Sequence, residues 1–198
     1  MKQMKVRITF TEPVLGSSPG DKEIYSTFIV SKGPNAMTLE EEVEAIGEDA
    51  VEEKGTTVFP RLEDGTPFLW DYQVRGFFKS ACKFMNLSDA KNKLTAYKSK
   101  IDGLVFVEER KIPFEMPKKS EIGILQRPLR ASTAQGERVA LASSEMIPEG
   151  TSCEFTITCL DDSLMKRVEA WLDYGKYSGL GQWRNGSYGR FTWEKIKE

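Results

Sequence analysis

Histidine is absent from this sequence of 198 residues. Its absence removes the side chain most often used for proton transfer near neutral pH, and also the commonest zinc ligand in proteins. Histidine-based hydrolases and nucleases are therefore excluded, while chemistry that uses a carboxylate with a metal, a lysine or a tyrosine stays open. The sequence favours a protein without catalytic residues, without a bound metal and without a cofactor.

Long apolar runs are also missing. No stretch approaches the roughly 18 consecutive apolar residues that span a bilayer. The first residues, Met1 to Val6, lack the apolar block of a signal peptide. We expect a cytoplasmic protein with no membrane partner. The hydrophobic content of 39% is nevertheless enough to bury a core.

Cysteine is scarce. The three cysteines, Cys82, Cys153 and Cys159, form no CxxC pair, and their odd number argues against a disulfide framework. Cys153 and Cys159 are six residues apart in a segment of alternating polarity, so a strand would place both on one face. We predict that all three are small core residues.

Charge is unevenly distributed along the chain. Residues 38–64 hold ten acidic side chains against Lys54 and Arg61, which is a balance of −8. The net charge of the whole chain is −2, so the remainder carries +6. A basic body with one acidic segment is compatible with a polyanionic partner.

The segments that follow one another along the chain predict an α+β fold. Alternating or β-branched stretches predict strands, and apolar residues at helical spacing predict helices. Strands are expected over 5–11, 23–30, 104–107, 139–147, 152–160 and 191–196. Helices are expected over 38–50, over 72–86, from Ser88, and from Leu164 to either Gly175 or Gly179. We also expect 139–147 and 152–160 to form an antiparallel pair.

This order predicts a single domain over residues 1–198, with a ferredoxin-like (RRM-like) antiparallel sheet and helices on one face. Two additions interrupt it, an acidic insertion at about 36–56 and a hairpin arm at about 110–140. The helix over 72–86 is expected to bury an apolar face that includes Phe84. Arg75, Lys79 and Lys83 recur at i, i+4 and i+8 on another face and are candidates for binding RNA.

A glycine-rich loop precedes the last strand. Its four glycines, Gly179, Gly181, Gly186 and Gly189, permit positive φ angles and close approach of the backbone, so main-chain amides could face a phosphate. Three basic residues, Lys176, Arg184 and Arg190, add positive charge. Two aromatic residues, Trp183 and Tyr188, offer faces on which unpaired bases could stack. These residues together predict an RNA-binding loop.

A structural explanation of the same loop is also open. A glycine-rich turn could merely join a helix to a strand, with Trp183 and Tyr188 packed in the core. The loop follows a helix rather than a strand, so it matches neither the dinucleotide-binding fingerprint nor the Walker loop.

Residues 174–191, which contain this loop, resemble the hallmark of the RAMP (repeat-associated mysterious protein) superfamily. That hallmark is a C-terminal glycine-rich loop between the last helix and last strand of a ferredoxin-like domain. Residues 147–157 resemble the penultimate strand of such proteins, and 64–79 are similar to the segment that leads into their first helix. This segment departs from the family at Trp70-Asp-Tyr72, where a small, serine-containing stretch is usual.

The likeness is greatest to the backbone subunits that polymerise along the guide RNA of CRISPR effector complexes. It implies a protein of antiviral defence that binds single-stranded RNA, oligomerises on it and contacts other subunits of a CRISPR-type complex. Members that cleave RNA use histidine, or an aspartate ahead of the first helix. This chain has no aspartate around 55–57, although Asp49 lies nearby, so the resemblance implies binding without cleavage.

Two other functions compete with this prediction. The first is a protein-interaction module, encoded by a phage or another mobile element, that copies a backbone subunit and joins or inhibits a CRISPR-type ribonucleoprotein; the acidic segment 38–64 supports it. The second is an endoribonuclease, with or without a metal, whose candidate residues are Asp21, Asp49, Asp64 and Asp71.

Overall fold

The computed structural model describes residues 1–19, 56–133 and 136–196. Contacts within the chain divide it into two compact units. The first unit comprises Met1–Val14, Pro60–Glu121 and Ile147–Glu198, and the second comprises Leu15–Phe59 and Ile122–Met146. The strand expected over 23–30 and the acidic helix expected over 38–50 lie outside the described residues.

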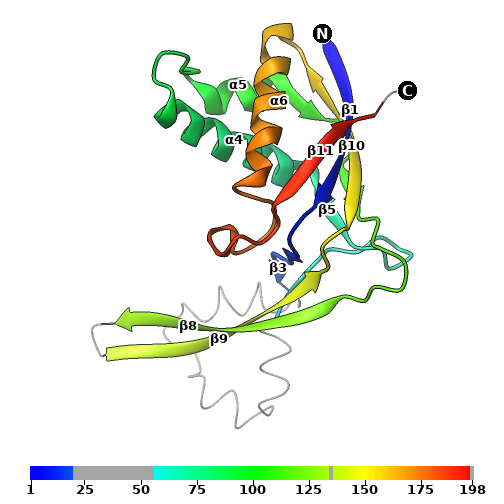
Figure 1. The fold of residues 1–198 in the computed structure, drawn as a ribbon, viewed down its shortest axis with the longest axis vertical. Helices are drawn as coiled ribbons and strands as arrows, with labels where there is room; N and C mark the ends of the chain where they lie inside the picture. The colour runs from blue at the N-terminus through cyan, green and yellow to red at the C-terminus, as the bar shows by residue number, and fades with distance from the viewer. Residues whose placement is uncertain (20–55, 134–135, 197–198) are drawn as a thin grey trace, which may run out of the picture. The chain divides into compact units, whose positions relative to one another are not determined.

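The first unit is built on a four-stranded antiparallel sheet (Figure 1). Its strands, in spatial order, are β11 (Phe191–Lys195), β1 (Lys2–Phe10), β10 (Ser152–Cys159) and β6 (Val105–Val107). Alternate residues of β1 are buried, as the polarity pattern predicts. One face of the sheet therefore contributes to the core.

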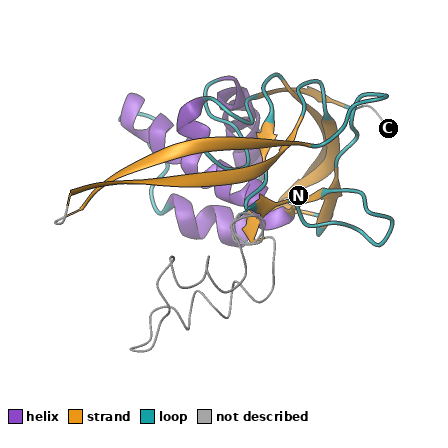
Figure 2. Cartoon of the chain, turned by 90° about the horizontal axis from the view of Figure 1, so that it is seen from below, coloured by secondary structure: helices purple, strands orange, loops and turns teal. Residues whose placement is uncertain are grey.

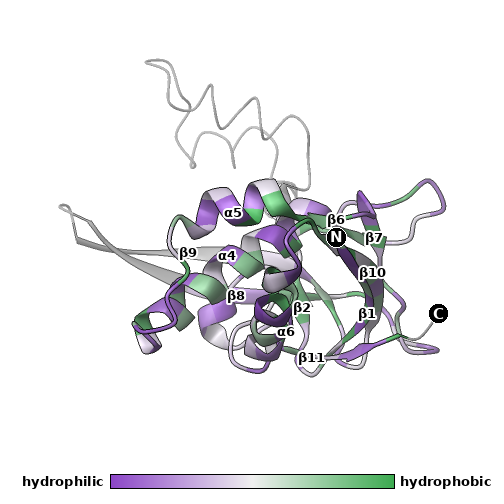
Figure 3. Ribbon diagram, turned by 90° about the horizontal axis from the view of Figure 1, so that it is seen from above, coloured by the Kyte–Doolittle hydropathy of each residue, from purple (hydrophilic) through white to green (hydrophobic). Residues whose placement is uncertain are grey.

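Three α-helices of the described chain cover that face of the sheet (Figure 3). They are α4 (Asp71–Ser88), α5 (Tyr97–Leu104) and α6 (Met165–Asp173). Three short 3₁₀ helices lie near α6 in the sequence, η1 (Asp162–Leu164), η2 (Tyr174–Lys176) and η3 (Arg184–Gly186). Helix α4 buries Phe77 and Phe78, and α6 buries Val168 and Trp171, so the predicted apolar faces supply the core. The α+β class is confirmed.

The two strands of a short ribbon flank α4 and α5 in the sequence. Strand β5 (Phe68–Trp70) pairs with β7 (Lys111–Pro113) in antiparallel register, with Trp70 opposite Lys111. The backbone amide of Trp70 donates to Oε1 of Gln73 at 2.9 Å. This bond satisfies one donor where α4 begins, immediately after β5.

The second unit contains a long hairpin, which Figure 2 shows as a twisted ribbon. Its strands are β8 (Gly123–Thr133) and β9 (Gly136–Ile147). Strand β9 also neighbours two short strands, β2 (Val14–Leu15) and β4 (Thr57–Val58), and β4 pairs with β3 (Ser18–Pro19). A carboxylate oxygen of Glu145 accepts the Phe59 amide at 2.8 Å, and its main-chain carbonyl accepts Gly16 N–H at 2.9 Å.

Two sequence predictions are wrong in detail. The segment 139–147 does not pair with 152–160, because β9 pairs with β8 while both edges of β10 are occupied by β1 and β6. No helix starts at Ser88, because α4 continues to that residue and a turn follows. The Asp89 carboxylate accepts the amides of Lys91 and Asn92 and so holds the turn.

Candidate nucleic-acid interface

The glycine-rich loop is closed at its base by two glycines in close backbone contact. The Leu180 amide donates to the Gly189 carbonyl at 3.0 Å, and the Gly189 amide donates to the Pro13 carbonyl at 2.8 Å. A Cβ on Gly179 would lie 1.8 Å from the Gly189 carbonyl oxygen, and a Cβ on Gly189 would lie 1.8 Å from that of Leu180. These two glycines are therefore required by the backbone geometry of the loop itself.

At the tip of the loop, two aromatic residues stack on each other. The rings of Trp183 and Tyr188 have centroids 5.2 Å apart and planes 17° apart. Trp183 has a positive φ of 52° and is 42% exposed. Gly186 lies beneath the indole, where a Cβ would approach it to 2.9 Å. Trp183 is thus held at the surface rather than packed in the core, whereas Tyr188 is half-buried.

The loop lies against the first turns of α4. Gln73, Gly76 and Phe77 of the helix line a pocket of about 200 Å³ together with Leu180, Gly181 and Arg184 of the loop. A neighbouring hollow of about 300 Å³ is formed by residues 181–185 alone. The glycine-rich loop and α4, which the sequence predicts separately as RNA-binding segments, are therefore brought together, and the exposed Arg184 of the loop lines the pocket that they share.

The cations predicted on α4 differ in their surroundings. Nη2 of Arg75 donates to Oδ2 of Asp71 at 3.1 Å, and Lys79 forms an ion pair with Asp102. Lys83 is exposed, with its ammonium 5.5 Å from the centroid of the Phe84 ring. Arg75 and Lys79 already have acidic partners, which leaves Lys83 as the cation of this helix best placed to meet a phosphate.

The cations of the loop region also differ. Lys176 and Arg184 are exposed, and no ion pair involves either of them in the described part of the chain. Arg190 is half-buried, and its Nε is buried without a hydrogen-bond partner. Its carbonyl accepts the Thr11 amide at 2.9 Å, so Arg190 has a part in joining the loop to the sheet.

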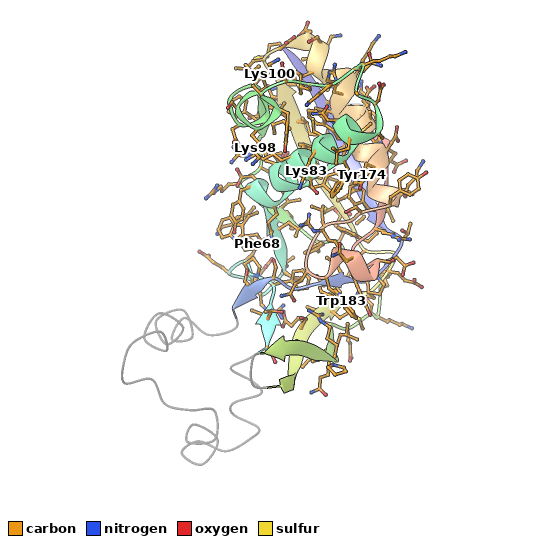
Figure 4. The ribbon with its side chains drawn as sticks, turned by 90° about the vertical axis from the view of Figure 1, so that its left-hand side faces the viewer. Phe68, Lys83, Lys98, Lys100, Tyr174 and Trp183 are labelled. Atoms are coloured by element: carbon orange, nitrogen blue, oxygen red, sulfur yellow. The ribbon has the colours of Figure 1, made fainter. Side chains whose placement is uncertain are left out.

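A surface aromatic cluster was missed by the sequence analysis. Phe84, which was predicted to be in the core, is 46% exposed and lies against Tyr174 with centroids 6.3 Å apart and planes 20° apart. The ring centroids of Tyr177 and Tyr174 are 6.2 Å apart, and Tyr177 is itself exposed. Lys83 lies beside Tyr174 in Figure 4, which shows both on the same side of the first unit as Trp183.

Little in the sequence pointed to this cluster, because Phe84 and Tyr174 belong to segments ninety residues apart. Helical spacing placed Phe84 at the edge of the apolar face, and only the packing of α4 against α6 decides which edge residue reaches the surface. The spacing of Tyr174 and Tyr177, three residues apart at the end of a helix, was the one local hint.

The face of the sheet away from the helices carries paired charges. Arg7 pairs with Glu154 and Glu194 across the strands, and Thr156 bonds the carboxylate of Glu109. Among the described residues of this face, Phe106 is the aromatic side chain with appreciable exposure. RRM domains stack bases on aromatics of their sheet; this charge-paired surface is not suited to that mode.

Two of the four candidate ribonuclease residues, Asp64 and Asp71, lie within the described residues. The other two, Asp21 and Asp49, lie outside them. Asp64 is exposed in a turn, and hydrogen bonds from Thr66 lower the pKa of its carboxyl. Asp71 is buried and engaged by two arginines, Arg75 and Arg110. In the described ranges no group of three or more His, Cys, Asp or Glu residues is arranged to hold a metal ion.

The chain has no significant match among protein-family models or among curated proteins. Its fold is similar to that of a chain in the cryo-EM structure of the Type III-B Cmr-beta bound to cognate target RNA. The TM-score is 0.52 with 11% sequence identity, and the match covers 99% of this chain and 60% of that one.

A chain of a Type IV-B CRISPR complex is also similar, with a TM-score of 0.47 and 11% identity; the match covers 98% of this chain and 90% of that one. At such low identity, the similarity to the Type III-B chain shows a common fold. No helix in residues 1–19, 56–133 or 136–196 has the length and apolar character needed to span a membrane.

Proposed function

We propose that this protein is a RAMP-like, single-stranded RNA-binding subunit that acts without cleaving its ligand. The first unit supports a ferredoxin-like assignment, because β1, α4, β6, β10, α6 and β11 follow the order βαββαβ and its helices share one face. The fold similarity to a chain of an RNA-bound CRISPR complex is consistent with this class.

The observation that carries the proposal is the meeting of the glycine-rich loop with α4. The pocket lined by Gly76, Gly181 and Arg184 has a cation at its edge, and the same loop presents the exposed Trp183. Single-strand binders combine basic grooves for the backbone with aromatic faces for the bases, each stacked base contributing about 1–3 kcal/mol. Both components are present here, together with the cluster of Lys83, Phe84 and Tyr174.

Size-exclusion chromatography with light scattering tests the proposal directly. The protein is run with and without an unstructured RNA of about 40 nucleotides, at salt concentrations that span the range over which phosphate contacts weaken. We expect a salt-sensitive complex with several protomers on each RNA, because a backbone subunit oligomerises along its ligand. Intact RNA after incubation with magnesium or manganese is expected as well.

The double variant Lys176→Ala with Arg184→Ala should bind more weakly. If each side chain neutralises one phosphate, the slope of log K against log salt should become shallower by about 1.4 for single-stranded RNA. Lys5→Ala is the matched control, since Lys5 lies on the sheet face away from the helices and pairs with Glu154 at 3.5 Å. No complex with wild-type protein at any salt concentration would refute RNA binding.

A protein-binding mimic is the second candidate, and the balance of −8 over residues 38–64 is the observation that favours it. Such a mimic would join or block a CRISPR-type ribonucleoprotein by copying a backbone subunit. It should bind a subunit of the complex tightly and RNA weakly, with strong dependence on salt during association. The chromatography above separates the two, because a mimic would leave the RNA unbound.

A further inference from the structure

Three residues where the β5–β7 ribbon meets α4 form a compact surface group, which we call the platform: Trp70, Tyr72 and Arg110. Trp70 is the last residue of β5, Tyr72 is the second residue of α4, and Arg110 directly precedes β7. The rings of Trp70 and Tyr72 are stacked, with centroids 6.1 Å apart and planes 16° apart.

Arg110 is held over these rings by an ion pair. Its guanidinium carbon lies 5.2 Å from the Trp70 centroid and 6.0 Å from that of Tyr72. Its Nη1 is 2.7 Å from Oδ1 of Asp71, a carboxylate whose side chain is only 10% exposed. Arginine stacked in this way is pre-organised, so little side-chain entropy remains to be lost when it meets an anion.

The platform is supported from the ribbon side and open to solvent. Phe68 contacts Trp70 edge-on with centroids 4.8 Å apart, and the Lys111 ammonium lies 5.4 Å from the Phe68 ring. In contrast, Tyr72 is 51% exposed and the Arg110 side chain is 67% exposed. Apart from its pair with Asp71, no hydrogen bond of the guanidinium is made in the described chain.

We infer that the platform is a base-stacking site for single-stranded RNA, in which the exposed ring of Tyr72, supported by Trp70, receives a nucleobase and Arg110 binds an adjacent phosphate. This inference rests on the proposed function and extends it. An exposed aromatic side chain beside a largely exposed guanidinium matches the two parts of a nucleotide. A purely structural stack would not require either group to remain exposed.

The geometry of α4 connects the platform with the glycine-rich loop. Tyr72 and Gly76 are one helical turn apart on the same side of α4, and Gly76 lines the pocket that contains Arg184. Four residues of helix span about 6 Å, which is about two nucleotides at the stacked spacing of roughly 3.4 Å. An RNA strand that binds at the pocket and runs toward the start of α4 would therefore reach Tyr72 within about two nucleotides.

Fluorescence anisotropy with two probes tests the inference. One probe is a fluorescein-labelled uridine 20-mer, and the other is an oligomer of the same length that lacks bases. Tyr72→Ala should weaken binding of the uridine probe roughly 5- to 150-fold, the range expected for loss of one stacked base. It should leave binding of the abasic probe unchanged, and Tyr72→Phe should behave as wild type.

Arg110 is tested with the same probes. Arg110→Gln should weaken both, because a phosphate contact does not depend on the base, whereas Arg110→Lys should recover part of the binding to the abasic probe, because it keeps the charge but not the stacked guanidinium. Thermal melting of each variant identifies any that fail to fold. Photo-crosslinking of wild-type protein to 4-thiouridine RNA gives a result without mutation: crosslinks are expected at Trp70 or Tyr72.

The outcomes separate the two claims. If wild-type protein binds neither probe, the proposed function fails and the inference fails with it. If wild-type protein binds RNA but folded Tyr72→Ala binds equally well, or crosslinks map only elsewhere, the inference is overturned while the proposed function stands. An equal loss on both probes for Tyr72→Ala would also overturn the stacking role.

Discussion

Gly189→Ala is a substitution for which the loop geometry predicts a large loss of stability. The new Cβ would lie 1.8 Å from the Leu180 carbonyl oxygen, far inside the 3.4 Å at which ordinary contact begins. Gly189 also has a φ of +69°, which costs an alanine about 1–2 kcal/mol. Overpacking adds about 1–3 kcal/mol. We therefore expect a loss of about 3 kcal/mol, or about 6–12 °C in melting temperature for a chain of this size.

Two glycine variants provide matched controls in thermal melts followed by circular dichroism. Gly65 has a φ of +86°, and no atom lies within 4 Å of the position that its Cβ would take, so Gly65→Ala should show the backbone cost alone, about 1–2 kcal/mol. Gly103 lies within α5 and is equally unobstructed, so Gly103→Ala should be neutral or stabilising by up to about 1 kcal/mol. A Gly189→Ala melt that coincides with Gly65→Ala would refute the close approach at the base of the loop.

Three further predictions concern side chains. The three cysteines should not react with a thiol reagent at pH 8 in the native protein, and all three should react in guanidinium. Burial raises the pKa of the thiols of Cys82, Cys153 and Cys159, that of Cys159 to about 11, and so removes the thiolate. Rapid labelling of the native protein would contradict this. Asp71→Asn should lower the free energy of unfolding by about 1.5–3 kcal/mol, because a buried carboxylate bonded to two arginines is lost. Urea melts measure this change, and an unchanged midpoint would show that the two ion pairs do not stabilise the fold. Phe84→Ala should weaken RNA binding in anisotropy titrations with little change in melting temperature, because the ring is already exposed. A large loss of stability would show instead that Phe84 belongs to the core.

The sequence predicted the principal elements of the first unit well. The alternation of β1 and β10 and the apolar stripe of α6 correspond to burial in the structure, since these patterns follow from strand and helix geometry. The sequence did not predict the strand partner of 139–147, because the polarity patterns of 123–133 and 152–160 do not distinguish which of them pairs with it. Pairing depends on which sheet edges are already occupied, and that is a property of the whole sheet.

For the candidate site, the sequence identified the loop and its residue types but not the role of each. Positive charge on Arg75, Lys79 and Lys83 looked alike in the sequence, yet two of the three are paired with carboxylates in the structure. The platform was recognisable only as an unusual Trp70-Asp-Tyr72 triplet. Arg110, which completes it, is distant in sequence and gave no local signal.

Local chemistry determined, from the sequence alone, that the chain has no histidine chemistry, that its elements form an α+β fold and that a glycine-rich loop precedes its last strand. Tertiary structure decided which glycines permit backbone contact, which aromatic rings remain at the surface and which cations pair with a carboxylate of the described residues. The physical reason is that periodicity depends on neighbours along the chain, whereas exposure and ion pairing depend on neighbours in space.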